Sequence, residues 1–478
     1  MKKQIILSLV LGCSFILTGC DDYLGEAPRG NAVAETTDDY EALLNASSIA
    51  ELYFMSSYYN YWKSDEIIFT ENTLSSLVGN LQNPATLYNA FKYQDKTYQV
   101  DQDCPEIKEI YSQIYTYNLI INGVGDAEGS AKDKEYLEAE ARVARAYMHF
   151  LLAQWFGAPY NETTAATELA IPIVTQANTN EKEFNRATVA EICDFVTSEM
   201  ENYCPKLKDR KEHKMRIYKP TGYALMGKVY FMMGKYGEAL KALQTAMQML
   251  QSDNTITLED YNETMAMYGY AEIPSYELSN FITIPSMSSE TIWCRAYNPY
   301  YGMYSSWGAE VGYLTPKAYG LFGEGDLRRN LIYTVDDYGF PTVYPSAAHL
   351  SQKINLGVSL PEVYLMYAEC EARVGSEQKA RETLVSFRKT RMQSGYEAIP
   401  ETVQNKNDLI RFCVDEESRE MMGTGYRFYN IRRLWNDPLF QDMKPVTHTD
   451  GQNVYTLNEA QLKEDIPESI LKWNENWR

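Results

Sequence analysis

Apolar residues recur every three or four positions along most of this chain, which is the spacing of one face of an α-helix. The pattern is clear over residues 106–124 and again over residues 135–156. A third stretch, residues 188–203, repeats it and begins at Thr188, a residue type that caps helix N-termini well. The sequence therefore predicts a mainly α-helical protein.

Residues 221–250 carry a more specific helical pattern. Seven residues stand at offsets 0, 3, 7, 9, 12, 16 and 19, the signature positions of a tetratricopeptide helix pair: Gly227, Tyr230, Gly234, Tyr236, Ala239, Leu243 and Ala246. The small residues would let two antiparallel helices approach closely, with the turn at Gly234. An ordinary helical hairpin is the alternative interpretation. Residues 361–388 contain a weaker copy, with four matches at offsets 0, 7, 12 and 16: Ala368, Gly375, Ala380 and Leu384.

Residues 251–360 separate the two copies and lack long helical periodicity. They are rich in Pro, Gly, Ser, Tyr and Trp, and the short runs 281–284 and 290–293 have the composition of β-strands. Loop-rich excursions from a helical scaffold commonly carry its variable, functional surface. We therefore expect this loop-rich insert to carry the ligand surface.

The N-terminus predicts a secretion signal. Two lysines precede an apolar run from Ile5 to Leu17, which is too short to span a bilayer but fits the hydrophobic region of a signal peptide. The run ends in Leu17-Thr18-Gly19-Cys20, which resembles a bacterial lipobox. A plain signal peptide with an incidental cysteine is the alternative. The lipobox predicts a membrane-anchored chain with a signal peptide at 1–19, lipid on Cys20, a tether at 20–37 and one domain at 38–478.

Composition and charge restrict the partners. Of the 478 residues, 45% are hydrophobic and 23% are charged, as in an ordinary folded protein. Lys and Arg number 44 against 65 Asp and Glu, which gives a net charge of −21. Such a surface repels phosphate backbones, so we expect no nucleic-acid partner. It also argues against a highly anionic ligand, because capturing one would need a local basic patch and none is evident.

Motifs for catalysis or metal binding are missing from the sequence. The four histidines are far apart, and His149 lies within a predicted helix, where a packing role is the more common one. We therefore expect a binding protein without cofactor or metal, and not an enzyme. Six cysteines follow Cys20 without metal-ligand spacing, and we expect most to be buried free thiols: Cys104, Cys193, Cys204, Cys294, Cys370 and Cys413.

Tyrosine occurs 39 times, against 16 Phe and 7 Trp. Two aromatic groups fall outside helical periodicity, one near Trp62 and one near Trp307. Flat rings beside polar side chains suit a sugar ring or a peptide side chain. We expect packing roles for Tyr53 and Tyr313, and Trp293 is equally consistent with packing and with binding. The predicted ligand-binding residues are Tyr59, Tyr61, Trp62, Arg295, Asn298, Tyr300, Tyr301, Tyr304 and Trp307.

Five blocks, in order behind the lipobox, resemble the SusD/RagB family of outer-membrane lipoproteins of Bacteroidetes. They are Pro28-Arg29-Gly30 with Thr37 to Leu44, Tyr111 to Asn118, Ala139 to Pro159, Val363 to Glu369, and Glu417 to Arg433. The resemblance implies a SusD-like fold and a position at the cell surface. It also implies a lid on a SusC-like TonB-dependent transporter, which captures oligosaccharides or, in RagB-type relatives, peptides.

Four arginines of these blocks, Arg142, Arg145, Arg419 and Arg427, are expected to be structural. We expect them to pair with carboxylates such as Glu140, Glu417 or Glu420. The combined interpretation is a lipid-anchored, outward-facing outer-membrane protein for nutrient uptake in polysaccharide utilization. The alternatives are a peptide-binding lid of the same fold, a surface glycosidase and a tetratricopeptide adaptor.

Overall fold

The computed structural model describes residues 34–50, 52, 59–68, 84–181, 183–210, 213–278, 281–296, 313–335, 341–347, 350 and 353–478. Helices dominate these residues, as the apolar periodicity predicts, and the strands are few and short. Within the described ranges, no helix combines the length and the apolar composition needed to cross a membrane.

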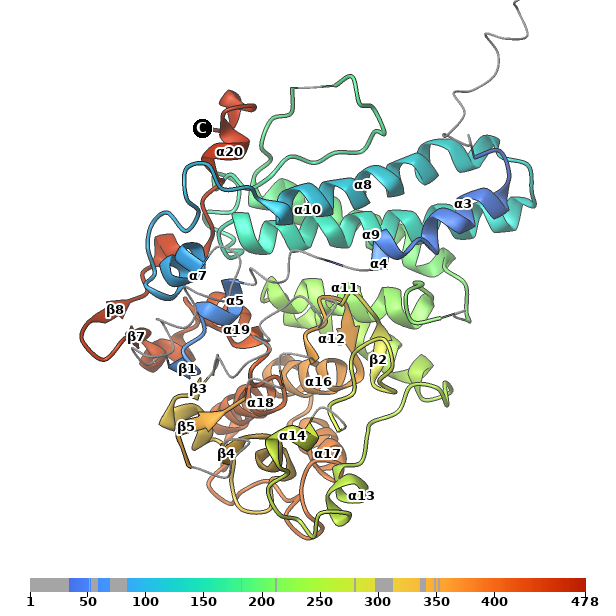
Figure 1. Ribbon diagram of the computed structural model, residues 1–478. Coiled ribbons are helices and arrows are strands. Elements are labelled where there is room, and N and C mark those ends of the chain that lie inside the picture. Colours follow the sequence, from blue (N-terminus) through green and yellow to red (C-terminus); the bar gives the residue numbers. More distant parts are fainter. Residues whose placement is uncertain are drawn as a thin grey trace, which may run out of the picture.

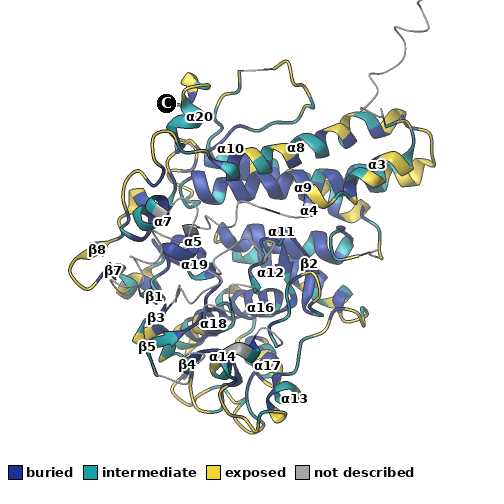
Figure 2. Cartoon of the chain, viewed as in Figure 1, coloured by how far each residue is buried: buried dark blue, intermediate teal, exposed yellow. Residues whose placement is uncertain are grey.

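Three long helices and a short one form the N-terminal part of the molecule, on one side in Figure 1. They are α3 (Thr37–Leu44), α8 (Pro105–Gly123), α9 (Ala131–Phe156) and α10 (Val189–Tyr203). The last three confirm the helices predicted from periodicity, and Thr188 caps α10 as expected. From Leu137 to Phe156 nearly every side chain of α9 is buried, because α8 and α10 pack against it (Figure 2).

The predicted tetratricopeptide pair is present as α11 (Lys219–Met232) and α12 (Tyr236–Leu250). Gly234 forms the turn between them with a φ of +72°, a conformation that favours glycine. The helices touch closely at Gly227, where a Cβ atom would lie 2.6 Å from Cγ of Leu243. The spacing of small residues therefore has the structural role that the sequence indicates.

The C-terminal helices include the weaker second copy. They are α16 (Leu360–Val374), α17 (Glu377–Arg388), α18 (Lys406–Glu420) and α19 (Tyr426–Leu434). Helix α16 packs against both α12 and α17, so the two helix pairs are neighbours in space although the loop-rich insert separates them in sequence. Figure 1 shows α11 and α12 between the N-terminal helices and this C-terminal group.

In its described residues, the loop-rich insert contains short elements only. Its helices are α13 (Tyr261–Ala266), α14 (Ser275–Leu278) and α15 (Pro316–Tyr319). The strand predicted at 290–293 is confirmed as β2 (Thr291–Trp293), which pairs with β6 (Val358–Ser359). The strand predicted at 281–284 is wrong. Phe281 N–H bonds to the carbonyl of Leu278 in a turn, and the run pairs with no strand among the described residues.

A small antiparallel sheet joins the start of the chain to the insert in the order β1-β3-β5-β4. Its strands are β1 (Ile67–Ile68), β3 (Tyr313–Leu314), β4 (Tyr333–Val335) and β5 (Pro341–Ser346). A hairpin near the C-terminus pairs β7 (Thr447–Thr449) with β8 (Val454–Thr456). The remaining short helices are α4 (Ser47–Ala50), α5 (Tyr59–Trp62), α7 (Pro84–Phe91) and α20 (Glu468–Leu471).

Buried ion pairs attach the insert to the C-terminal helices. Arg391, which follows α17, lies 2.5 Å from Glu290 and 2.9 Å from Glu420. Arg328 of the insert contacts Glu416 of α18 at 2.6 Å. Burial alone would raise the pKa of Glu420, but Arg391 and Arg328 outweigh it and lower that pKa to about 2. The insert is therefore fixed to the helical scaffold by charges that have left water.

The four family-block arginines are paired to carboxylates, as predicted, but the named partners are wrong. Glu140 pairs with Arg216, Glu417 with Arg433, and Glu420 with Arg391 and Arg328. The observed pairs are Arg142 with Glu138 and Glu199, Arg145 with Glu199, Arg419 with Glu416, and Arg427 with Asp65. Most of these partners are distant in sequence, so local spacing could not identify them.

The six cysteines after Cys20 are free and buried, as predicted. His149 is also a core residue. Its Nδ1 lies 2.9 Å from the carbonyl of Arg145, and its Nε2 accepts a hydrogen bond from Val174 N–H. Burial lowers the pKa of His149 to about 4, so the ring is neutral near pH 7.

Candidate functional site

The two aromatic groups belong to segments whose ends are joined. We call residues 53–66 the first aromatic segment and residues 297–312 the second. At one end, Leu52 N–H donates to the carbonyl of Ala296 at 3.3 Å. At the other end, β1 and β3 pair with Ile67 opposite Leu314. Two stretches almost 250 residues apart in sequence therefore begin and end at the same places in the fold.

The far end of the first aromatic segment is anchored to the α18–α19 corner. Asp65 accepts two hydrogen bonds from Arg427, the shorter at 2.7 Å, and Gly423 N–H donates to Oε1 of Glu66 at 3.0 Å. Burial acts to raise the pKa of Asp65, but the Arg427 guanidinium outweighs it and holds that pKa below its usual range. Within the described part of the chain Glu66 forms no ion pair, and burial raises its pKa to about 8 although the charge of Arg427 acts to lower it.

Lys63 and Ser64 extend this anchor. The ammonium of Lys63 is buried, lies 2.5 Å from Glu464 and donates to the carbonyl of Gln461. The carbonyl of Ser64 contacts Nε2 of His448 at 2.7 Å. The polar residues that follow the first aromatic group therefore hold the segment onto the C-terminal part of the fold.

The described aromatic residues of both groups lie in the core. Trp62 is fully buried, and Tyr61 packs its ring against Trp62 edge to face at 5.8 Å. Trp293 and Tyr313 are also buried. This confirms the packing role predicted for Tyr313. It also shows that Trp293, which was equally consistent with packing and with binding, packs in the core. The structure does not support ligand contact by Tyr61 or Trp62, because neighbouring side chains cover both rings. Sequence reasoning placed them on a surface because they adjoin polar residues, which here form the anchor.

Arg295 is likewise enclosed. Its guanidinium lies over the Trp293 ring at 3.9 Å and donates to the hydroxyl of Tyr117 at 3.1 Å. Only about 2% of Arg295 is exposed, so its charge is directed into the fold, and the structure does not support direct ligand contact by this residue. Its observed role is to fix the strand that leads into the second aromatic segment.

The other predicted site residues lie outside the described part of the chain. They are Cys20, Asn298, Tyr300, Tyr301, Tyr304 and Trp307, together with the side chain of Tyr59. Tyr53 also lies outside it. Lipidation of Cys20, the packing role of Tyr53 and ligand contact by the others stay predictions.

A wide groove lies beside the point where the aromatic segments begin. It has a volume of about 1040 Å³. Its walls come from residues 209–210, 213–215 and 218–220, from the end of α12 with the turn that follows it, and from Ser286. Four of the lining residues carry basic side chains: Arg210, His213, Lys214 and Lys219. Two carboxylates also line it, and both are engaged: Asp209 pairs with Lys219, and Asp253 accepts a hydrogen bond from Tyr218. We call this feature the basic groove.

The basic groove corrects an expectation from the sequence. Residues 206–219 contain seven Lys and Arg but only two acidic residues, in a chain whose net charge is −21. This cluster of basic residues is visible in the sequence, but the strongly negative net charge of the whole chain gives no indication of it. A local excess of basic side chains is therefore present, so the net charge of the chain alone does not exclude an anionic ligand.

A smaller pocket of about 200 Å³ lies at the β1–β3 end of the aromatic segments. Asp65, Glu66 and Arg427 form part of its wall, with Lys317 and Ser418. The joined segments therefore have a hollow near each end, and both hollows are lined by groups that can donate and accept hydrogen bonds.

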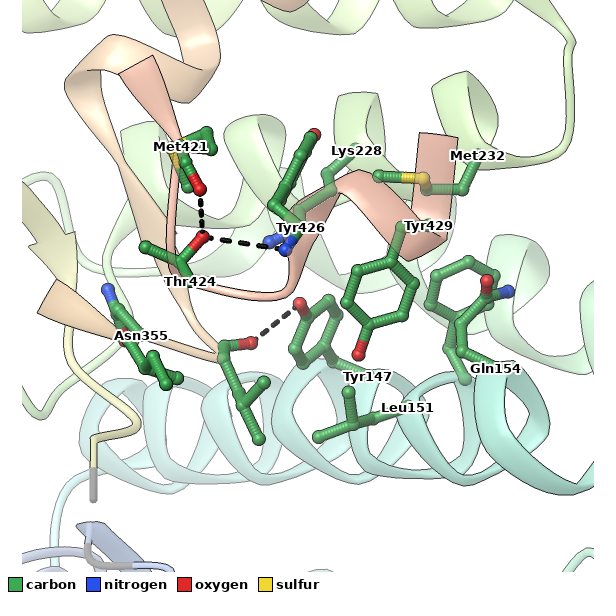
Figure 3. A pocket seen from close by; sticks show the side chains of 13 residues that line it. Tyr147, Leu151, Gln154, Lys228, Met232, Asn355, Met421, Thr424, Tyr426 and Tyr429 are labelled. Atoms are coloured by element: carbon green, nitrogen blue, oxygen red, sulfur yellow. Dashed lines mark hydrogen bonds between the residues drawn. The ribbon is translucent and has the colours of Figure 1, made fainter. Parts of the chain in front are cut away.

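A third cavity, shown in Figure 3, lies where α9, α11 and α19 meet. Tyr147 from α9 and Tyr429 from α19 point into it, and Tyr147 donates to the carbonyl of Leu356 at 2.8 Å. Its volume of about 30 Å³ is the share of a single water molecule. We interpret it as a packing junction between helices and not as a ligand site.

Over the described ranges, no three His, Cys, Asp or Glu residues are grouped in a way that could hold a metal ion. The carboxylates at the 200 Å³ pocket include Asp65, which is engaged by Arg427. The chemistry that these surfaces offer is hydrogen bonding and charge pairing.

Comparisons with known proteins agree with this architecture. A family model described as "Starch-binding associating with outer membrane" matches residues 22–231, and one described as "SusD family" matches residues 360–476. Among curated proteins, none matches this sequence.

Solved structures of similar fold come from Bacteroides. A putative sugar binding protein of Bacteroides vulgatus is 19% identical, with a TM-score of 0.68 over 94% of this chain and 99% of its own. A SusD superfamily protein of Bacteroides thetaiotaomicron is 18% identical, with a TM-score of 0.68 over 93% and 99%. A SusD-like carbohydrate binding protein of Bacteroides vulgatus is 15% identical, with a TM-score of 0.59 over 93% and 97%.

Proposed function

Because the chain belongs to the SusD/RagB family, we propose that it captures an oligosaccharide at the cell surface and passes it to a SusC-like TonB-dependent transporter. The family is associated with the outer membrane and with carbohydrate binding. In this proposal the protein is held on the membrane by lipid on Cys20 and acts in nutrient uptake. We propose a binding role for the chain and assign no catalytic residue.

The joined ends of the two aromatic segments are the observation that carries the proposed ligand site. The hydrogen bond between Leu52 and Ala296 and the β1–β3 pair attach both segments to the same two places. Residues of the second segment, chiefly Tyr300, Tyr301, Tyr304 and Trp307, would supply aromatic faces for sugar rings. Polar groups in the two adjoining hollows would bind hydroxyls.

A ligand screen tests this proposal. The mature protein, without residues 1–19, is titrated against panels of oligosaccharides and peptides by calorimetry. We expect a glycan to bind and Trp307→Ala to weaken it by about tenfold or more, since losing one stacked ring costs roughly 1–3 kcal/mol. Trp473→Ala is the matched control, because Trp473 is 79% exposed and far from the joined segments in sequence.

The other outcomes separate the alternatives. Binding of peptides with indifference to glycans would assign the chain to the peptide-binding type. Consumption of the glycan would show an enzyme. Glycan binding that Trp307→Ala leaves unchanged would remove the second aromatic segment from the site.

The proposed lipid anchor on Cys20 and the proposed transporter partner need a separate experiment. We expect the wild-type chain to take up labelled fatty acid, to fractionate with outer membranes and to co-purify with a SusC-like transporter. Cys20→Ser should abolish labelling and membrane association while leaving glycan affinity unchanged. Membrane association that survives Cys20→Ser would contradict the lipid anchor.

A further inference from the structure

The basic groove has cationic groups that the fold does not neutralise. Several cations of residues 206–219 pair internally: Lys208 with Glu41, Arg216 with Glu140 and Lys219 with Asp209. Arg210 and Lys214 are different. Among the residues that the structure describes, no carboxylate lies within ion-pair distance of either side chain, although both line the groove.

Lys214 is the more constrained of the two. It is half-buried, and its ammonium donates to the carbonyls of Met287 and Ser288, the first at 3.2 Å. Burial lowers the pKa of Lys214 below its usual range, although the charge of Glu259 acts in the opposite direction. An anionic group placed beside it would lower the free energy of the site.

The groove wall is attached directly to the start of the second aromatic segment. The carbonyl of Lys214 accepts from Cys294 N–H at 2.8 Å, and the carbonyl of Met215 accepts from Trp293 Nε1 at 3.1 Å. His213 contacts the side chain of Asn45 at 3.0 Å, not far along the chain from the first segment. The groove wall therefore adjoins the strand β2, which precedes the second aromatic segment in the sequence.

The rest of the lining suits a carbohydrate. Hydroxyl and amide side chains face the groove and can bind sugar hydroxyls: Ser252, Asn254, Thr255 and Ser286. The volume of about 1040 Å³ is large enough for an oligosaccharide fragment. An extended nucleic acid is disfavoured by the net charge of −21 on the whole chain.

We propose that the basic groove binds a carboxylate or sulfate carried by the sugar ligand, so that the protein selects acidic oligosaccharides. This inference rests on the proposed carbohydrate-binding function and names its substrate class. Arg210 would form charge-assisted hydrogen bonds to the acidic group, Lys214 would contribute its half-buried charge, and the hydroxyl and amide side chains of the lining would bind neighbouring sugar hydroxyls.

The test compares acid-bearing oligosaccharides with their own neutral counterparts, in which uronates are reduced to alcohols or sulfates are removed. Each pair is titrated into the full mature protein and into the double variant Arg210→Gln/Lys214→Gln. We expect the wild type to prefer the acidic member by about tenfold or more, as two charge-assisted hydrogen bonds allow. We also expect added salt to reduce this preference.

The double variant should lose the preference and keep its affinity for the neutral member. Lys241→Gln is the matched control, because Lys241 is exposed on α12 outside the groove. Arg210→Gln alone is a second test, since Arg210 is exposed and its replacement does not disturb the contacts of Lys214. Circular dichroism and the melting temperature confirm that each variant is folded.

Each other result has a distinct meaning. Equal affinity for acidic and neutral members overturns this inference and leaves the proposed function in place. A preference that persists in the double variant shows that the groove is not its source. Binding of no oligosaccharide of either kind overturns both proposals. Binding to phosphatidylglycerol vesicles that the double variant loses, without any acid preference, would assign the groove to a lipid surface instead.

Discussion

Glu66 is the residue whose protonation matters most at the joined segments. One of its oxygens accepts from Gly423 N–H, and the other has no hydrogen-bond partner among the described residues. Burial raises its pKa to about 8, whereas an unfolded chain has a value of about 4.3. The folded state therefore binds the proton more tightly, and the carboxyl group is protonated near pH 7.

This shift predicts a pH dependence of stability. Between roughly pH 4.5 and pH 8 the folded state holds more protons than the unfolded one, so the contribution of Glu66 is lost as pH rises through that interval. We expect Glu66→Gln, which cannot titrate, to gain stability relative to the wild type by on the order of a few kcal/mol from pH 5 to pH 8. Denaturant unfolding at both pH values measures this.

Two comparisons make the Glu66 experiment specific. Glu417, whose pKa burial also raises to about 8, titrates in wild type and variant alike and cancels in the difference. Glu401→Gln, at an exposed loop position, should show no such relative gain. A constant difference between Glu66→Gln and wild type at both pH values would show that Glu66 is ionised throughout.

Trp62 gives a second prediction at the residue scale. Because the side chain is fully buried, Trp62→Ala should lower the free energy of unfolding by about 3–5 kcal/mol. Trp473→Ala, at a site 79% exposed, should change it by no more than about 0.5 kcal/mol. Urea unfolding of the two variants measures the contrast. Equal stability of both would mean that Trp62 is not part of the core.

At the scale of elements, the α11–α12 pair depends on the absence of a side chain at Gly227. Alanine is the better helix former, yet its Cβ would lie 2.6 Å from Leu243 Cγ. We expect Gly227→Ala to destabilise the protein by about 1–3 kcal/mol. Gly237→Ala on α12 is the matched control, because nothing lies within 4 Å of its Cβ position, and it should stabilise by up to about 1 kcal/mol.

Thermal unfolding of the two glycine variants distinguishes packing from helix propensity. If propensity dominated, both substitutions would raise the melting temperature. A stabilising Gly227→Ala would therefore contradict the close helix contact and favour an ordinary, looser hairpin.

Helices were predictable from this sequence because their signal repeats within a few residues. The apolar spacing located α8, α9 and α10, and the small residues located α11 and α12. The run 281–284 shows the limit. Its composition suits a strand, but a strand exists only if a partner lies beside it, and here the run follows the α14 turn instead.

The candidate site was harder to predict for the same reason. Composition drew attention to both aromatic groups, but the contact between Ile67 and Leu314 is a tertiary one. The partner of Arg427, Asp65, is 362 residues away in sequence. Burial of Trp62 follows from those long-range contacts, so a local pattern could not separate a core ring from a surface ring.

At the scale of the whole molecule, buried ion pairs unite the insert with the helical scaffold. Arg391→Met would leave Glu290 and Glu420 buried without their shared partner. We expect a loss of about 3–5 kcal/mol in the free energy of unfolding, together with faster proteolysis within residues 257–293. Arg411→Met breaks an exposed pair with Asp442 and should cost no more than about 1 kcal/mol.

Mass spectrometry of timed proteolytic digests locates the loosened region. Cleavage confined to the insert would show that the ion pairs fasten it to a scaffold that remains folded. If Arg391→Met and Arg411→Met lowered the free energy of unfolding equally, the buried ion pairs would not be what holds the insert to the scaffold.

The joined ends of the aromatic segments have a consequence for how binding specificity can change. The scaffold offers four attachment points, Leu52, Ile67, Ala296 and Leu314, and these are held by backbone hydrogen bonds and strand pairing. Such bonds do not depend on which side chains lie between them. The first stretch must keep the buried Trp62 and the anchoring Asp65 and Glu66. Residues 297–312 can be exchanged for others of equal length on this fixed frame, which makes a new ligand preference reachable by replacing that stretch alone.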